Sequence, residues 1–214
     1  MFTGIVEEIG TVSRLWRTGA GYNLMIQART VLDDVKLGDS IAVNGTCLTV
    51  THFDAHSFTV GLAPETRNRT NLEHLREGQR VNLERSVTPT TRMGGHFVQG
   101  HIDGVGTITQ FRPDADALWV TVQTTPDIMR YIVPKGFIAL DGVSLTVVDV
   151  FEDRFTVTLV AYTQQHIILP QKQIGYTINI EVDILGKYVE KMMSHPSAQP
   201  AGISLDFLAQ HGYQ

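Results

Sequence analysis

The sequence predicts an all-β protein made of two tandem copies of one barrel-forming unit, followed by a C-terminal helix. Three observations support this prediction: the sequence repeats itself once, short segments alternate apolar and polar residues, and turn residues interrupt these segments often. The 214 residues include 43% hydrophobic and 18% charged residues, which is typical of globular proteins. The length therefore accommodates two small units and a tail.

The repeat consists of four pairs of matching blocks that follow one another in the same order. The first pair is offset by 96 residues, from position 4 to position 100, and the other three pairs are offset by 97. The four pairs are 4–12 with 100–108, 41–50 with 138–147, 58–60 with 155–157, and 78–84 with 175–181. One single-residue slip over four blocks indicates a duplicated domain.

Each copy has the pattern of antiparallel strands joined by tight turns. Residues 57–62 and 154–159 alternate apolar and polar side chains, and β-branched residues are frequent. Asn44-Gly45 and Asp141-Gly142 predict hairpin turns, because both residue types tolerate a positive φ. A β-rich unit of this size with frequent turns favours a small closed or half-closed Greek-key barrel.

Helical signals are few before the tail. Residues 70–75 and 126–132 each predict one short helical turn. Residues 184–193 carry apolar side chains near helical spacing, and such a short helix needs a packing partner. Residues 196–214 are rich in small and polar residues after Pro196, and we expect them to be loosely ordered.

Composition and charge exclude several classes of function. The net charge of -5 and the pI of about 5.9 disfavour nucleic-acid binding. Cys47 is the single cysteine, so no internal disulfide and no cysteine-based zinc site is expected. No targeting segment and no stretch of 18 apolar residues is visible, so we expect no membrane span and a cytoplasmic location.

Four motifs in a fixed order carry a family resemblance. They are MFTGIVE at the start, NGTCLTV from Asn44, GGHFVQGHIDG from Gly94 and KGFIALDGVSLTV from Lys135. Over about residues 1–195 the sequence resembles riboflavin synthase of the alpha-subunit type, in the lumazine-binding domain family. The resemblance implies two six-stranded Greek-key barrels over 1–96 and 97–183, an oligomerisation helix over 184–195 and a tail over 196–214.

The resemblance also implies an activity and an assembly. Two molecules of 6,7-dimethyl-8-ribityllumazine would exchange a four-carbon unit and give riboflavin and 5-amino-6-(ribitylamino)uracil, with no metal and no redox cofactor. The C-terminal helix would build a homotrimer. Each active site would then lie between the first barrel of one subunit and the second barrel of a neighbour.

Carried onto this sequence, the resemblance implies two pockets whose backbone groups and Thr hydroxyls contact a pteridine edge. The first pocket would contain Gly4, Ile5, Val6, Cys47, Leu48, Thr49, Gly61, Leu62, Ala63, Pro64, Glu65, Thr66, Gly100, His101 and Ile102. The second would contain Gly100, His101, Ile102, Lys135, Ser144, Leu145, Thr146, Thr158, Leu159, Val160, Ala161, Tyr162 and Thr163. The glycines would let the backbone approach the flat ring, and Glu65, Thr66 and Thr163 would bind the ribityl chain.

The reaction requires a proton to leave the 7-methyl group of one lumazine and an attack on C7 of the other. The candidates for handling protons are His101, Cys47, Ser40, Ser144 and Asp141. Histidine is the usual proton shuttle near neutral pH, and a thiol acts as a nucleophile only when its pKa is lowered. Stacking of the two rings could itself supply much of the acceleration.

Structural roles compete with these assignments. Cys47 could be a small buried hydrophobe, Lys135 a solvated charge, and Asp141 only a hairpin residue. His96 and His101 are spaced by five with no third ligand nearby, which disfavours a metal site, and His96 could cap a turn between the barrels.

Two other functions remain open at this point. A relative of this fold could hold a lumazine or flavin as an optical antenna without catalysis, but the second copy keeps the polar residues that such proteins lose. A purely structural pair of barrels is disfavoured by polar residues at equivalent positions. The sequence does not indicate which pocket holds the donor.

Overall fold

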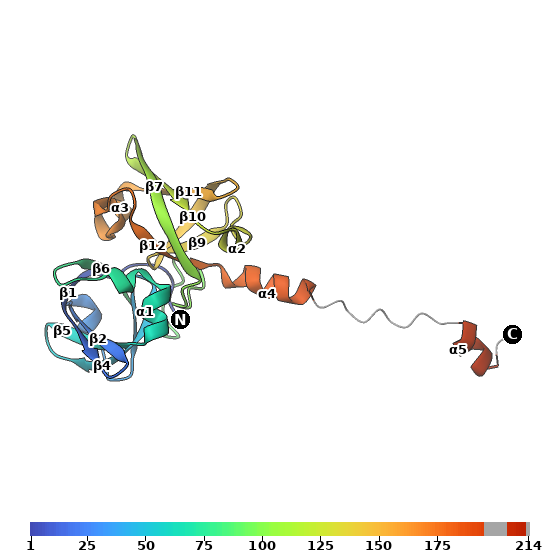
Figure 1. Ribbon diagram of the computed structural model, residues 1–214, viewed down its shortest axis with the longest axis horizontal. Helices are drawn as coiled ribbons and strands as arrows, with labels where there is room; N and C mark the ends of the chain where they lie inside the picture. The colour runs from blue at the N-terminus through green and yellow to red at the C-terminus, as the bar shows by residue number, and fades with distance from the viewer. Residues whose placement is uncertain (195–204, 213–214) are drawn as a thin grey trace. The chain divides into compact units, whose positions relative to one another are not determined.

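The computed structural model describes residues 1–194 and 205–212. Within residues 1–184 the chain forms two closed antiparallel barrels of six strands each, which together make one compact body (Figure 1). The predicted pair of six-stranded barrels is therefore confirmed. The predicted boundary between residues 96 and 97 falls inside segment 86–103, which joins the last strand of one barrel to the first strand of the next.

The first barrel closes in the strand order β1-β2-β5-β4-β3-β6. Its strands are β1 (Glu8–Thr18), β2 (Gly21–Gln27), β3 (Ser40–Val43), β4 (Thr46–Phe53), β5 (Ser57–Leu62) and β6 (Arg80–Arg85). Closure comes from β6, which pairs with β1 on one side and with β3 on the other.

The second barrel repeats this order strand for strand, as β7-β8-β11-β10-β9-β12. Its strands are β7 (Gly104–Asp114), β8 (Ala117–Gln123), β9 (Phe137–Leu140), β10 (Val143–Val150), β11 (Arg154–Leu159) and β12 (Thr177–Val182). Irregularities in register also recur, between Val12 and Arg14 in β1 and between Ile108 and Gln110 in β7. The two copies therefore share their pattern of strand pairing as well as their sequence motifs.

The helices are short and lie mostly in equivalent loops. They are α1 (Pro64–Arg69), η2 (Asn71–His74), α2 (Pro126–Met129), α3 (Ala161–His166) and the 3-10 turns η1 (Thr30–Leu32) and η3 (Leu169–Gln171). The two predicted helical turns correspond to η2 and α2, whereas α1 and α3 were not predicted. Proline at the first position of α1 and of α2 suits a helix start, because that residue needs no N–H donor.

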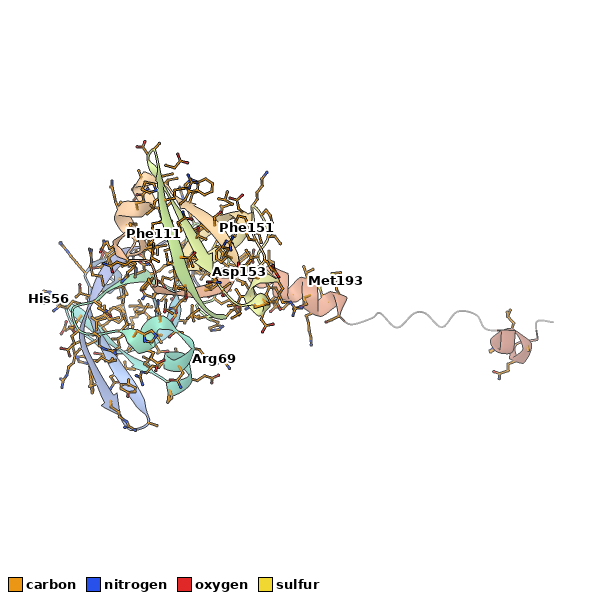
Figure 2. The ribbon with its side chains drawn as sticks, turned by 45° about the horizontal axis from the view of Figure 1, so that its top comes forward. His56, Arg69, Phe111, Phe151, Asp153 and Met193 are labelled. Atoms are coloured by element: carbon orange, nitrogen blue, oxygen red, sulfur yellow. The ribbon has the colours of Figure 1, made fainter. Side chains whose placement is uncertain are left out.

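Each barrel has its own apolar core. Alternate residues along the strands point inward, for example Leu24 and Ile26 in β2 and Val120 and Val122 in β8, all fully buried. Figure 2 shows these interiors filled with side chains, while His56 and Asp153 mark equivalent turns at the β4–β5 and β10–β11 ends. A third, smaller cluster contains Phe2, Ala42, Val98 and Ala139, with Cys47 packed against it.

The barrels meet at their hairpin turns. Asn44-Gly45 and Asp141-Gly142 both have positive φ angles, as the sequence predicts for tight hairpin turns. A side-chain carbon on Gly45 would lie 2.6 Å from the backbone nitrogen of Gly142, and one on Gly142 would lie 2.7 Å from that of Gly45. Only glycine allows this back-to-back contact.

Two asparagines cross this contact symmetrically. Asn82 Nδ2 donates to the Asp141 carbonyl at 3.0 Å, and Asn179 Nδ2 donates to the Asn44 carbonyl at 2.8 Å. The acceptor oxygens of the same side chains bind the backbone N–H groups of Ile168 and Asn71, respectively. These bonds satisfy buried polar groups of both barrels and fix one barrel against the other.

The tail forms α4 (Ile184–Met193), which confirms the predicted C-terminal helix, and α5 (Leu205–Gln210). The predicted loose order of residues 196–214 falls mostly outside the described residues and stays a prediction. Within the described part of the chain, no helix is both long and apolar enough to cross a membrane.

Candidate functional site

Two short segments cross from the start of each copy to the other barrel. We call residues 2–6 the first strap and residues 98–102 the second strap. Ser144 of β10 donates its backbone N–H to the Gly4 carbonyl at 2.8 Å, and Cys47 of β4 donates to the Gly100 carbonyl at 2.8 Å. The straps also pair with each other, because Phe2 and Val98 exchange backbone hydrogen bonds of 2.7 and 3.2 Å.

Each strap has a glycine at the point where its backbone lies close to a strand of the opposite barrel. Gly4 and Gly100 have φ angles of +78° and +82°, which other residues rarely adopt. An added side-chain carbon would lie 2.6 Å from Ser144 Cβ in the first case and 2.6 Å from Cys47 Cβ in the second. Each strap is thus pressed against one strand of the opposite barrel.

In the structure the strap residues contact different barrels from those assumed in the grouping predicted from the sequence, and the grouping itself stays a prediction. Gly4, Ile5 and Val6 were assigned to the first pocket, but Gly4 binds Ser144 and Val6 packs against the core of the second barrel. The segment from Gly100 to Ile102 was assigned to both pockets, but Gly100 binds the first barrel at Cys47. The repeat aligns the straps with each other and carries no information on which barrel each one contacts.

Strands β4 and β10 carry equivalent pairs of side chains beside the straps. We call Cys47 and Thr49 the first edge, and Ser144 and Thr146 the second edge. Cys47 and Ser144 are half-buried, and Thr49 and Thr146 are exposed. Alternate residues of a strand share a face, so both side chains of each edge point outward beside a strap. Leu48 and Leu145 point inward into the barrel cores, which leaves only their backbone groups for a ligand.

The residue opposite each threonine differs between the barrels. Ser40 of β3 pairs with Thr49, whereas Phe137 of β9 pairs with Thr146. The first edge therefore has an additional hydroxyl, and the second has an aromatic ring that is 45% exposed. Lys135 precedes β9 with a φ of +66° and an exposed side chain, and its N–H donates to the Val147 carbonyl.

The predicted segments 61–66 and 158–163 follow β5 and β11 into equivalent helices. Leu62 and Leu159 point into the cores, and the remaining side chains are exposed or half-buried. Those remaining residues are Gly61, Ala63, Pro64, Glu65, Thr66, Thr158, Val160, Ala161, Tyr162 and Thr163. Glu65 pairs with Arg69 at 3.3 Å in α1, whereas Tyr162 stacks on His166 with ring centres 4.1 Å apart in α3.

His96 belongs to the second edge, which the sequence did not predict. Its Nδ1 lies 2.7 Å from Ser144 Oγ and its ring stacks on Phe137, while its Nε2 has no hydrogen-bond partner among the described residues. Burial lowers the pKa of His96, which favours the neutral ring. In the sequence, the pair Gly94-Gly95 just before His96 could have indicated a close backbone contact. The structure shows this contact, since a side-chain carbon on Gly95 would lie 2.1 Å from the Thr3 carbonyl oxygen.

Asp141 lies in the interface between the barrels. Its Oδ1 accepts from Asn71 Nδ2 at 2.8 Å and from the Asn179 N–H at 2.9 Å, and its Oδ2 accepts from Tyr176 Oη at 2.8 Å. Burial raises the pKa of Asp141 to about 7, against these hydrogen bonds, which lower it. The surroundings favour the structural role that the sequence left open.

Two buried glutamates bind the straps and were also missed. Burial raises the pKa of Glu84 in β6 and of Glu181 in β12 to about 7, although backbone N–H groups of the straps lower both values. Both were visible in the sequence as an identical residue at equivalent positions. A charged residue at a core position of a strand indicates a specific partner.

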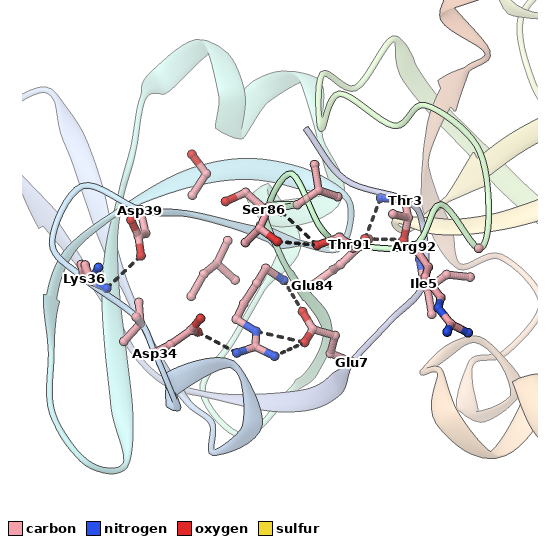
Figure 3. A pocket seen from close by; sticks show the side chains of 17 residues that line it. Thr3, Ile5, Glu7, Asp34, Lys36, Asp39, Glu84, Ser86, Thr91 and Arg92 are labelled. Atoms are coloured by element: carbon pink, nitrogen blue, oxygen red, sulfur yellow. Dashed lines mark hydrogen bonds and ion pairs between the residues drawn. The ribbon is translucent and has the colours of Figure 1, made fainter.

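A cavity of about 790 Å³ lies beside the first barrel, between it and residues of the first strap and of segment 86–94, and adjoins the first edge at Ser40 (Figure 3). Arg85 lies in its wall and forms ion pairs with Glu7 and Asp34, and the hydrogen bond to Glu7 raises the pKa of Arg85. The hydroxyl-bearing residues of the lining are Thr3, Ser40, Ser86, Thr88 and Thr91. Within residues 1–194 and 205–212, no group of three His, Cys, Asp or Glu side chains is arranged to hold a metal ion.

Comparisons with known proteins agree with this duplicated geometry. The family model described as the lumazine binding domain matches twice, over residues 3–86 and 99–183. Riboflavin synthase of Actinobacillus pleuropneumoniae is 45% identical over 215 residues, with all of both chains covered. Riboflavin synthase of Schizosaccharomyces pombe is 50% identical over 195 residues, covering 90% of this chain and 94% of the relative.

The chain belongs to the riboflavin synthase family. The family explains the duplication, since each lumazine-binding domain corresponds to one barrel with its strap. Riboflavin synthase of Bacillus subtilis, 41% identical over 215 residues and fully covered, extends the match to a third relative. Membership makes the chain an enzyme, a transferase of riboflavin biosynthesis that acts on a small molecule.

Solved structures outside the riboflavin synthases share the fold. LumP complexed with 6,7-dimethyl-8-(1'-D-ribityl) lumazine superposes with a TM-score of 0.77 at 24% identity, covering 85% of this chain and 99% of LumP. LumP complexed with riboflavin gives a TM-score of 0.78 at 25% identity with the same coverage. At this identity the first of these superpositions supports the fold alone.

Proposed function

We propose that this chain transfers a four-carbon unit between two molecules of 6,7-dimethyl-8-ribityllumazine and forms riboflavin and 5-amino-6-(ribitylamino)uracil. The two products contain all the atoms of the two substrates, so the transfer needs no oxidant and no reductant. The observation that carries the proposal is the duplicated edge, an exposed threonine and a half-buried thiol or hydroxyl beside a crossing strap. Riboflavin synthases matching along the full chain support it.

Each edge with its surroundings would bind one lumazine. The first pocket would use Ser40, Cys47 and Thr49, segment 61–66 and the second strap with His101. The second would use Ser144 and Thr146, segment 158–163, Lys135 and the first strap. Thr hydroxyls and strand backbone groups can pair with the donors and acceptors of a pteridine edge, and the hydroxyls of the adjoining cavity suit a ribityl chain.

The two pockets offer different reactive groups. His101 follows Gly100, whose carbonyl accepts from Cys47, and its exposed imidazole would accept the proton that leaves the 7-methyl group of one lumazine. In the second pocket, Ser144 with His96 at 2.7 Å would assist addition at C7 of the other lumazine. Holding both rings in reactive register would supply a large part of the rate enhancement.

The optical-antenna alternative is less well supported. The LumP structures share the fold at 24–25% identity, whereas riboflavin synthases match at 41–50% identity. Both edges keep polar residues here, including Lys135, Ser144 and Thr146 of the second copy. An antenna protein would bind lumazine or riboflavin without turnover.

We further propose a homotrimer in which the first pocket of one subunit faces the second pocket of a neighbour. Both edges lie on the outside of their barrels, and α4 has exposed apolar side chains at Tyr188, Val189 and Met192. The division into barrels over 1–96 and 97–183, the helix over 184–195 and the cytoplasmic location are part of the same proposal.

The shared site can be tested by mixing subunits. Chains carrying His101→Ala and chains carrying Ser144→Ala should each be nearly inactive alone. After subunit exchange, intact first pockets would meet intact second pockets, so part of the turnover should return. Absence of recovery in a mixture whose exchange is verified by native mass spectrometry would contradict the shared site.

The activity is tested with purified protein and 6,7-dimethyl-8-ribityllumazine as the only substrate, without cofactor. We expect one riboflavin for every two lumazines consumed, followed by absorbance and chromatography. Binding without turnover would support the antenna function instead. Neither binding nor turnover would contradict the proposal entirely.

A further inference from the structure

A carboxylate in the last strand of each barrel holds a strap through its backbone. Glu84 accepts from Thr3 N and Thr3 Oγ1 at 2.7 and 2.9 Å and from Gly4 N at 3.0 Å. Glu181 accepts from the N–H groups of Gln99, Gly100 and His101 at 2.6, 2.9 and 2.9 Å. Several backbone donors thus converge on one buried carboxyl group in each barrel.

These contacts cross between the barrels. Glu84 belongs to the first barrel, but the strap that it holds lies against Ser144 of the second edge. Glu181 belongs to the second barrel, but its strap lies against Cys47 of the first edge. Each pocket is therefore completed by a segment whose position is set from the other barrel.

We propose that Glu84 and Glu181 are crossed positioning residues for the four-carbon transfer: Glu181 orders the wall of the first pocket, including His101, and Glu84 orders the wall of the second. The proposal rests on the assignment of the two edges as ligand sites. In this proposal, neither Glu84 nor Glu181 contacts the substrate. Both act through the backbone of a strap.

The geometry of His101 shows why positioning matters. Its backbone N–H is bound by Glu181 Oε2, and the preceding residue, Gly100, is fixed by both Glu181 and Cys47. The His101 side chain is exposed, so its direction depends on this backbone anchor. A proton-transfer group needs placement to within a fraction of an ångström, which a free strap does not provide.

The test uses backgrounds in which one pocket is weakened. Thr146→Val leaves the first pocket intact, and Thr49→Val leaves the second intact. Riboflavin is the probe, titrated by fluorescence into full-length protein. In the Thr146→Val background, Glu181→Gln should weaken riboflavin binding about tenfold, because the amide turns a donor toward a backbone N–H. In the Thr49→Val background, the change should stay below about twofold.

Glu84→Gln should give the opposite pattern, with the loss in the Thr49→Val background. Glu8→Gln is a matched control, because Glu8 accepts backbone N–H groups of Arg29 and Val31 within its own barrel. It should lower the melting temperature without changing riboflavin affinity in either background. Losses in the variant's own barrel, or equal losses in both backgrounds, would overturn the crossed arrangement.

Turnover separates positioning from a purely structural effect. Glu181→Gln should lower kcat in the otherwise unchanged protein but lower it no further in a His101→Ala protein, since both changes remove the same group from the reaction. An equal further loss in that background would overturn the proposal. If either glutamine variant fails to fold, Glu181→Asp and Thr3→Val are the milder replacements.

Failure of the ligand-site assignment would look different. If Thr49→Val and Thr146→Val leave riboflavin affinity and stoichiometry unchanged, then the edges are not the binding sites, and the crossed proposal falls with them. If both valine variants weaken binding but the glutamate variants do not follow the crossed pattern, then only the positioning role is wrong.

Discussion

The two barrels share strand order, bulges and hairpin turns, yet the surfaces beside their straps differ in chemistry. The first edge combines Cys47 with the hydroxyl of Ser40, and His101 lies on its strap. The second edge combines Ser144 with Phe137 and the buried ring of His96. The two copies thus keep the same threonine beside each strap but differ in the side chains around it.

The backbone contacts between the two barrels are symmetric. Glycine substitutions test this symmetry, and we expect them to have the largest effect on the free energy of unfolding. Gly45→Ala and Gly142→Ala should each lower the free energy of unfolding by about 3 kcal/mol or more, because each new carbon would meet the partner's backbone nitrogen. Gly38→Ala is the control, since Gly38 has a φ of +90° but open space around it, and should cost about 1 kcal/mol. Urea denaturation measures all three. Unequal losses of unfolding free energy at positions 45 and 142 would contradict the symmetry of this interface.

The reactive groups are predicted to be asymmetric, and alanine substitutions test that difference. His101→Ala and Ser144→Ala should each lower kcat by about 100-fold or more, as expected for lost proton transfer or activation. Stability should change by only about 1 kcal/mol, because His101 is exposed and Ser144 loses one hydrogen bond. His56→Ala, at an exposed turn, is the control for turnover. A variant that keeps wild-type turnover removes its residue from the reaction.

The buried carboxyl groups predict that the stability of the folded chain depends on pH. The pKa values of Glu84, Glu181 and Asp141 are raised to about 7 in the folded chain, so the folded state holds protons that the unfolded state releases. Their contribution is complete below about pH 4 and is lost as pH rises to about 7, by at most about 3 kcal/mol for each glutamate and about 4 kcal/mol for Asp141.

Thermal unfolding between pH 5 and pH 8 should show this decline. His96, whose pKa is lowered by burial, acts in the opposite direction below about pH 6.5. Asp141→Asn should flatten the curve, because the equivalent position in the first barrel is already Asn44, which does not titrate. A curve of unchanged slope in Asp141→Asn would show that this carboxylate does not titrate in the range.

The sequence predicted what depends on local pattern. Alternation, turn residues and the repeat were enough for two barrels, the two hairpin turns and the threonine edges. The crossing of the straps could not be predicted, because the match between residues 4–12 and 100–108 is equally consistent with packing on either barrel. The short helix α3 was missed because six residues carry too little helical periodicity.

Residues that act through tertiary contacts were likewise hidden. His96 reaches Ser144 across 48 positions, and Glu181 reaches the second strap across about 80. Asp141 was a candidate for handling protons, but its partners Asn71, Tyr176 and Asn179 come from other loops and strands. The spacing of residues along the sequence does not predict such contacts.

We propose that one chain carries two separate, unequal lumazine pockets, one on each barrel. Calorimetric titration of the full-length protein with riboflavin tests it most directly, by counting sites in the wild-type chain and in the Thr49→Val and Thr146→Val variants. We expect two sites of different affinity per chain, with each variant weakening a different one. A single site per chain, or two sites that both weaken equally in either variant, would contradict it.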